Sequence, residues 1–165
     1  MELDLLFDRY MILAGDRRHG EDVAVTAGVA WVDGMRCVFA SAEETLASAA
    51  AYTKAARMLR LAGQTGAPCV HVGSMATSHL DSVSDGRSAA ALDAYARTVA
   101  TATCRRVAVL EGDTPPDLAE DFDATVSPSA GDSVSGASYT PGDAASARAA
   151  LARVLRDLAD GAPSP

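Results

Sequence analysis

The feature that most restricts the fold of this chain is an alternation of short apolar runs and longer helical patterns. The runs Met35–Ala40, Cys69–Val72 and Arg106–Leu110 are too short for helices and predict buried strands. Between them, Leu46–Ala62 and Ser88–Cys104 carry apolar residues at helical spacing. Because strands joined by helices pair in parallel through right-handed crossovers, the pattern predicts an α/β fold with a mostly parallel sheet.

A turn signal precedes this alternation. Val23–Val32 and Met35–Ala40 are rich in β-branched and small apolar residues, and Asp33-Gly34 separates them. An Asp-Gly pair favours a type I′ turn, because both central residues of that turn need a positive φ angle. The sequence therefore predicts an N-terminal hairpin.

Helical spacing also occurs near both ends of the chain. It predicts an amphipathic helix over Met1–Leu13. Near the other end, Asp143 is a typical N-cap for a helix that runs to Gly161. The alanine-rich helix in the centre is expected to stop at Gly63, since glycine favours helix ends.

The chain is expected to form one domain, because its 165 residues are 48% apolar. The core is predicted over residues 1–126, with a Ser-, Gly- and Pro-rich loop over 127–142, a helix over 143–161 and a loose tail over 162–165. Only 5% of the residues are aromatic, so alanine must build much of the core through close approach of helices and sheet.

Composition argues against several classes of function. The net charge of −8 and the pI near 4.7 disfavour nucleic acid, because phosphate binding needs clustered Lys and Arg. Cys37, Cys69 and Cys104 match neither a disulfide framework nor a zinc-ligand spacing, and no metal site is predicted. No apolar run approaches the ~20 residues needed to span a bilayer. A cytoplasmic protein without a membrane or nucleic-acid partner is expected.

Three stretches together carry a family resemblance. The first is Gly15–Arg17 followed by the hairpin Ala27–Gly34, the second is the helical stretch Tyr52–Ala62, and the third is Gly66–Val72. In order and spacing they resemble the α-type carboxyltransferase subunit of acetyl-CoA carboxylase and its crotonase-superfamily relatives, which include malonate decarboxylase subunits. The resemblance covers about residues 6–72 and weakens beyond them.

The resemblance implies a shortened crotonase-like ββα spiral that binds an acyl-CoA or another pantetheine thioester. In that family, backbone N–H groups of two glycine-containing loops hold the enolate oxygen. At the corresponding positions this chain has Ser41–Thr45, Gly73–Ser78 and Glu111–Pro116, which lack the family's loop motifs. The implied protein is a carboxyltransferase-like subunit, or a repurposed member, without the usual oxyanion loops.

Polar side chains after two predicted strands are the catalytic candidates. His79 and Asp81 follow the second parallel strand, at the edge where ligand sites of open α/β sheets concentrate. An imidazole oriented by a carboxylate can act as a base near pH 7, although a polar loop without catalytic function is the alternative. Glu43 and Glu44 follow the preceding strand and could act as general acid or base, or could cap the next helix.

Lys54, Arg57 and Ser74 are the candidates for binding the thioester. Lys54 and Arg57 lie about one helical turn apart and could contact CoA phosphates, or could form a solvated helix face. No covalently bound cofactor is expected, and acyl-CoA would be a substrate. His71, on a buried strand, is expected to be a hydrogen-bonded core histidine rather than a base.

Two kinds of function remain open, and an unrelated small-molecule-binding α/β domain would be a third if the resemblance were accidental. The chain could be a subunit that forms a homo-oligomer, or a hetero-oligomer with a second carboxyltransferase-like chain, because its shortened second half leaves alanine-rich helices partly uncovered. It could instead be an active enzyme of a biosynthetic pathway, a decarboxylase, lyase, cyclase or acyl/carboxyl transferase that acts on a thioester with side chains of the 74–84 loop.

Overall fold

The computed structural model of the chain describes residues 2–13, 25–42, 48–73, 86–110, 122–127, 136–138 and 143–161. Seven strands form one sheet in the order β1 to β7, antiparallel from β1 to β3 and parallel from β3 to β7. The elements are α1 (Leu3–Leu6), β1 (Arg9–Ile12), β2 (Thr26–Val32), β3 (Met35–Ala42), α2 (Ala49–Thr65), β4 (Cys69–Gly73), α3 (Gly86–Ala100), β5 (Arg106–Val109), β6 (Ala124–Ser127), β7 (Gly136–Ser138) and α4 (Ala144–Ala159).

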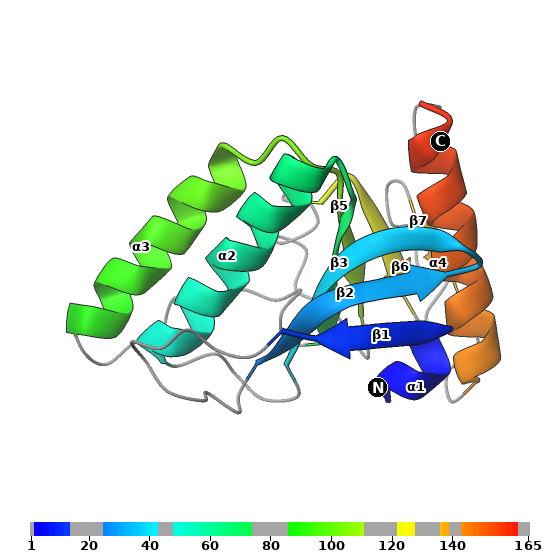
Figure 1. The fold of residues 1–165 in the computed structure, drawn as a ribbon, viewed down its shortest axis with the longest axis horizontal. Coiled ribbons are helices and arrows are strands. Elements are labelled where there is room, and N and C mark those ends of the chain that lie inside the picture. Colours follow the sequence, from blue (N-terminus) through cyan, green and yellow to red (C-terminus); the bar gives the residue numbers. More distant parts are fainter. Residues whose placement is uncertain are drawn as a thin grey trace.

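The predicted fold class is confirmed. β3, β4 and β5 are parallel neighbours, and α2 and α3 connect them on one side of the sheet (Figure 1). In that view α3 lies outside α2, while α4 lies on the other side of the sheet, next to α1. None of the helices in the described ranges is long and apolar enough to cross a membrane.

The two faces of the sheet bury different side chains, because successive strand residues point to opposite faces. The face under α1 and α4 packs bulky residues, among them Phe7, Phe39, Val70, Val72, Val107, Val109, Leu151 and Leu155. The face under α2 packs many small ones, among them Ala27, Ala40, Ala42, Ala51, Ala55, Ala62 and Cys69. The expectation that alanine builds much of the core is therefore confirmed.

The predicted hairpin is also confirmed. β2 and β3 pair in antiparallel fashion up to Val32 and Met35, and the turn between them is Asp33-Gly34. The φ angles of these two residues are 50° and 77°, both positive as a type I′ turn requires.

The predicted helix over Met1–Leu13 is wrong. α1 ends at Leu6, and residues 9–12 form β1 instead, which pairs with β2 from Arg9 opposite Trp31 to Ile12 opposite Gly28. A short helix is marginal by itself because nucleation is costly, whereas the exposed ladder of β2 offers hydrogen-bond partners to this backbone. Tertiary pairing therefore overrides the helical spacing.

Glycine is required at position 28, where β2 pairs with β1. A Cβ atom built on Gly28 would lie 1.9 Å from the carbonyl oxygen of Met11. Any side chain at this position would therefore push β1 away from its partner strand.

The structure corrects one helix end and confirms one helix start. α2 continues through Gly63 to Thr65, and Gly66 adopts the left-handed conformation with φ 64°. A Cβ atom on Gly63 would lie 2.9 Å from Oγ1 of Thr103, so this glycine permits close packing within the helix. At α4, the Asp143 carboxylate accepts the amide N–H of the first turn at 3.0 Å, as predicted for an N-cap.

The C-terminal part of the sheet differs from the expected loop. Within residues 127–142 the structure describes strand β7, which pairs in parallel with β6. β7 consists of three small residues, Gly136–Ser138, which are too few to show an apolar periodicity. Their strand conformation therefore depends on pairing with β6.

Candidate functional site

In the sequence, two groups of candidate site residues follow the carboxyl ends of the parallel strands β3 and β4. β3 ends at Ala42 and β4 ends at Gly73, and these two residues are Cα partners. One candidate segment follows Ala42 directly and the other follows Gly73 directly. Five of the candidates lie outside the described residues, and their roles stay predictions: Glu43, Glu44, Ser74, His79 and Asp81.

Both crossover helices begin at this carboxyl edge. Arg36, near the start of β3, donates to the carbonyl of Thr65 at the end of α2 at 3.3 Å. Arg106, at the start of β5, donates to the carbonyl of Val99 near the end of α3, also at 3.3 Å. The C-terminal ends of α2 and α3 therefore lie at the amino edge, and their N-termini face the carboxyl edge. The N-cap of α2 is Ser48, whose hydroxyl accepts an amide N–H of the first turn at 3.1 Å.

The two described binding candidates have different surroundings. Nζ of Lys54 donates to the carbonyl of Val25 at 2.6 Å, so this ammonium group ties α2 to the segment that enters β2. The side chain of Arg57 is exposed on the same helix. Of the two, Arg57 has the accessible position that a phosphate contact requires.

His71 is confirmed as a core histidine. It is only 1% exposed and lies on β4 between Ala40 of β3 and Ala108 of β5. Its ring meets the ring of Phe122 edge to face, with centroids 5.2 Å apart. The small neighbours leave the imidazole and the phenyl ring to fill this part of the face.

The cysteines are core residues and weak nucleophiles. Burial raises the pKa of Cys37 to about 12. Burial, with a smaller contribution from Cys104 and Cys37, raises the pKa of Cys69 well above its usual value, and burial also raises the pKa of Cys104. Since the thiolate is the reactive form, these thiols stay protonated at neutral pH and react slowly. In the described ranges no group of three or more His, Cys, Asp or Glu residues could hold a metal ion.

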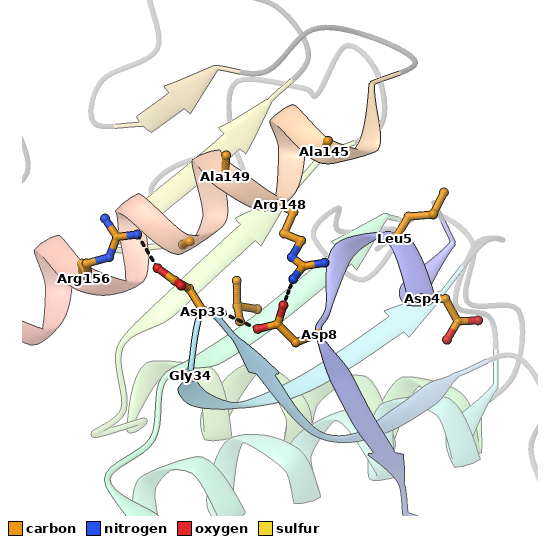
Figure 2. A pocket seen from close by; sticks show the side chains of 11 residues that line it. Asp4, Leu5, Asp8, Asp33, Gly34, Ala145, Arg148, Ala149 and Arg156 are labelled. Carbon is orange, nitrogen blue, oxygen red and sulfur yellow. Dashed lines mark hydrogen bonds and ion pairs between the residues drawn. The ribbon is translucent and has the colours of Figure 1, made fainter.

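A pocket of about 680 Å³ lies near the amino end of β3, between α1, the hairpin turn and α4 (Figure 2). Two ion pairs cross it, one between Arg148 and Asp8 and one between Arg156 and Asp33 at 2.6 Å. The backbone N–H of Asp33 also donates to the Asp8 carboxylate at 2.5 Å. The pocket therefore contains a charged network that joins the N-terminal segment, the hairpin and the C-terminal helix.

Sequence reasoning did not find this network. Asp33 and Arg156 are 123 positions apart, and no local pattern connects them. The sequence offered only a weak signal, the spacing of Arg148 and Arg156 by about two turns of one helix. This spacing places the two side chains toward the same side of the helix but does not indicate their partners.

No protein-family model and no curated protein matches this chain. Solved structures do match it. The β subunit of geranyl-CoA carboxylase from P. aeruginosa aligns with a TM-score of 0.61 and 20% identity, over 93% of this chain and 41% of that chain. The Pseudomonas malonate decarboxylase hetero-dimer aligns with a TM-score of 0.66 and 16% identity, over 93% of this chain and 83% of that chain.

A third match is transcarboxylase 12S, solved with methylmalonyl-CoA and methylmalonic acid bound. It aligns with a TM-score of 0.59 and 15% identity, over 75% of this chain and 28% of that chain. The fold is therefore the crotonase-like fold of carboxyltransferase subunits in a shortened form. These matches do not single out the α-type subunit of acetyl-CoA carboxylase. The chain spans less than half of the geranyl-CoA carboxylase and transcarboxylase chains.

Proposed function

We propose that this chain is a carboxyltransferase-like subunit of acyl-thioester metabolism, with a CoA or carrier-protein thioester as its ligand. The observation that carries the proposal is the extent of the fold match, because 93% of this chain corresponds to 83% of a malonate decarboxylase chain. The other matches include a geranyl-CoA carboxylase and a transcarboxylase that holds methylmalonyl-CoA. Proteins with this fold thus recur on acyl-CoA substrates.

The thioester would bind at the carboxyl edge of β3, β4 and β5. Ligands of open α/β sheets bind beyond the carboxyl ends of the strands. Here the ends of β3 and β4 are adjacent, and the N-termini of α2 and α3 face the same edge. Of the two described binding candidates, Arg57 is the one with an exposed side chain, and it would contact a CoA phosphate.

Isothermal titration calorimetry with acetyl-CoA and malonyl-CoA tests this proposal. We expect micromolar binding that Arg57→Ala weakens about five- to tenfold, as loss of about 1 to 1.4 kcal/mol would do. Arg153→Ala removes an equally charged, exposed side chain on α4 and should leave the affinity unchanged. Absence of binding to both esters and to a malonyl carrier protein would contradict the proposal.

Assembly with a second carboxyltransferase-like chain belongs to the same proposal. Two of the matched structures are a malonate decarboxylase hetero-dimer and a malonate decarboxylase hetero-tetramer. Since this chain lacks the family's glycine loops, the partner would supply the oxyanion donors. Loss of one such donor costs about 2.7–4 kcal/mol, or about 100- to 1,000-fold in rate. Biotin-dependent carboxyl transfer should therefore be undetectable in the isolated chain, and full activity there would contradict the subunit assignment.

An active thioester decarboxylase, lyase or cyclase is the second candidate. The adjacent ends of β3 and β4 favour it, because the segments that carry the candidate carboxylates and imidazole start from them. His79 would be the base and Asp81 its orienting partner, with Glu43 or Glu44 as the acid. Mass spectrometry of malonyl-CoA turnover should show a loss of at least about 100-fold in His79→Ala, the usual contribution of general base catalysis. Unchanged turnover in variants of all four residues would exclude them.

A further inference from the structure

The exposed large apolar side chains of the described residues lie in one short segment. Leu5, Met11 and Ile12 are 49%, 57% and 55% exposed, respectively. Met11 and Ile12 belong to β1, which is the first strand in the order of the sheet. Because neighbouring strand residues point to opposite faces, this edge strand exposes an apolar side chain on each face.

The backbone of β1 presents hydrogen-bonding groups at its outer edge. The N–H of Leu13 donates to the carbonyl of Ala27 in β2 at 2.8 Å. The alternation of an antiparallel ladder then directs the peptide groups of Tyr10 and Ile12 away from β2. A strand added on this side would bond to the peptide groups of those two residues.

Two charged residues at the start of β1, Asp8 and Arg9, have partners within the chain. The guanidinium of Arg9 lies over the ring of Trp31, 4.3 Å from its centroid. Asp8 is paired with Arg148 of α4. Natural edge strands are usually protected from pairing by charged side chains, proline or bulges that face outward. Because Arg9 and Asp8 each have a partner within their own chain, we expect two β1 strands to approach with little repulsion between these two groups.

We propose that β1 pairs in antiparallel fashion with β1 of a second copy of this chain, so that the two sheets become continuous across a twofold axis. In the register centred on Met11, Tyr10 of each copy faces Ile12 of the other, and Met11 faces Met11. This register forms about four main-chain hydrogen bonds and covers both exposed apolar side chains of β1, Met11 and Ile12. The occupant is a second copy because one twofold register matches apolar to apolar at every position from 10 to 12.

Sedimentation velocity of the full chain tests the pairing. Between about 1 and 200 µM we expect a shift from the 16.9 kDa monomer to a dimer of twice that mass, because so short a strand pair buries less than the ~800 Å² per partner of a stable interface. Met11→Lys places two ammonium groups face to face and should keep the chain monomeric. Leu5→Lys alters a comparably exposed side chain outside β1 and should leave the dimer unchanged.

Two further variants separate pairing from misfolding. A mixture of Met11→Lys with Met11→Glu should restore the dimer, and Met11→Cys should form an intermolecular disulfide on mild oxidation that Leu5→Cys does not form. Circular dichroism checks that each variant is folded. A wild type that stays monomeric throughout, or a dimer that persists in Met11→Lys, would overturn the inference. Pairing of β1 only with a different carboxyltransferase-like chain would overturn the choice of a second copy as occupant.

Discussion

Under α4 the sheet buries mainly bulky side chains, whereas under α2 half of the buried core residues are alanine. Phe39 and Leu151 represent the first face and Ala40 and Ala55 the second, and all four are 0% exposed. Each buried methylene contributes about 0.8 kcal/mol, so the bulky face supplies more stability per residue. Alanine contributes less, but it lets the backbone of α2 approach the sheet closely.

The two faces of the sheet therefore have different roles. The α4 face holds the N-terminal segment, the hairpin and the C-terminal helix together, both through its core and through the ion pairs of the pocket. The α2 face sets the distance of α2 from the sheet and thereby the position of its N-terminus at the carboxyl edge. Changes on the first face should alter stability, and changes on the second should also alter ligand binding.

The largest effect is expected from Phe39→Ala on the bulky face. The ring of Phe39 contacts the rings of Phe7 and Tyr10, with centroids 5.1 and 5.8 Å apart. Its removal leaves a cavity and should lower the free energy of unfolding by about 3–5 kcal/mol. Urea denaturation measures this loss, and a loss below about 1 kcal/mol would show that this face is not the main source of stability.

A smaller effect on stability, but a clearer one on function, is expected from Ala55→Leu on the alanine face. Overpacking should lower the free energy of unfolding by about 1–3 kcal/mol and displace α2 from the sheet. Malonyl-CoA affinity, measured by calorimetry on the folded variant, should fall with it. Ala90→Leu adds the same side chain at an exposed position of α3 and should change neither quantity. Equal affinity in both variants would refute the positioning role of the alanine face.

The two helix caps provide a finer comparison. Ser48→Ala and Asp143→Ala each remove a side chain that accepts a first-turn amide N–H, and each should cost about 0.5–2 kcal/mol. Hydrogen exchange should show lost protection at the start of α2 in the first variant and at the start of α4 in the second. Only Ser48→Ala should weaken thioester binding. An equal loss of binding in Asp143→Ala would mean that the two faces are not independent.

The smallest effect is expected from Arg156→Ala in the pocket. Arg156 and Asp33 are 55% and 61% exposed, so their pair should contribute no more than about 1 kcal/mol. The decrease in melting temperature should diminish as salt is added, because exposed charges are screened. Arg153→Ala, one turn away and exposed, is the control. A large, salt-independent decrease would show that the network carries more of the stability than its exposure allows.

Much of the fold could be predicted because its signals are local. An Asp-Gly pair between two strands favours a turn with positive φ angles, as Asp33-Gly34 adopts here, and Asp143 can cap the first turn of the helix that follows it. The alternation of strands and helices that follows the hairpin also depends on periodicities within each segment. The edge at which the candidate site is predicted follows from the parallel order of the strands.

The remainder depended on contacts between distant residues. Leu6 and Phe7, which a longer helix would place on its apolar face, are buried although residues 9–12 form a strand, so periodicity alone could not show that β1 replaces a helix. The close passage of Met11 over Gly28, the bond from Lys54 to Val25 and the pair of Asp33 with Arg156 each join separate elements. Local preferences act over a few residues, whereas register, close approach and charge pairing minimise the free energy of the whole packed chain, and only the tertiary structure decides them.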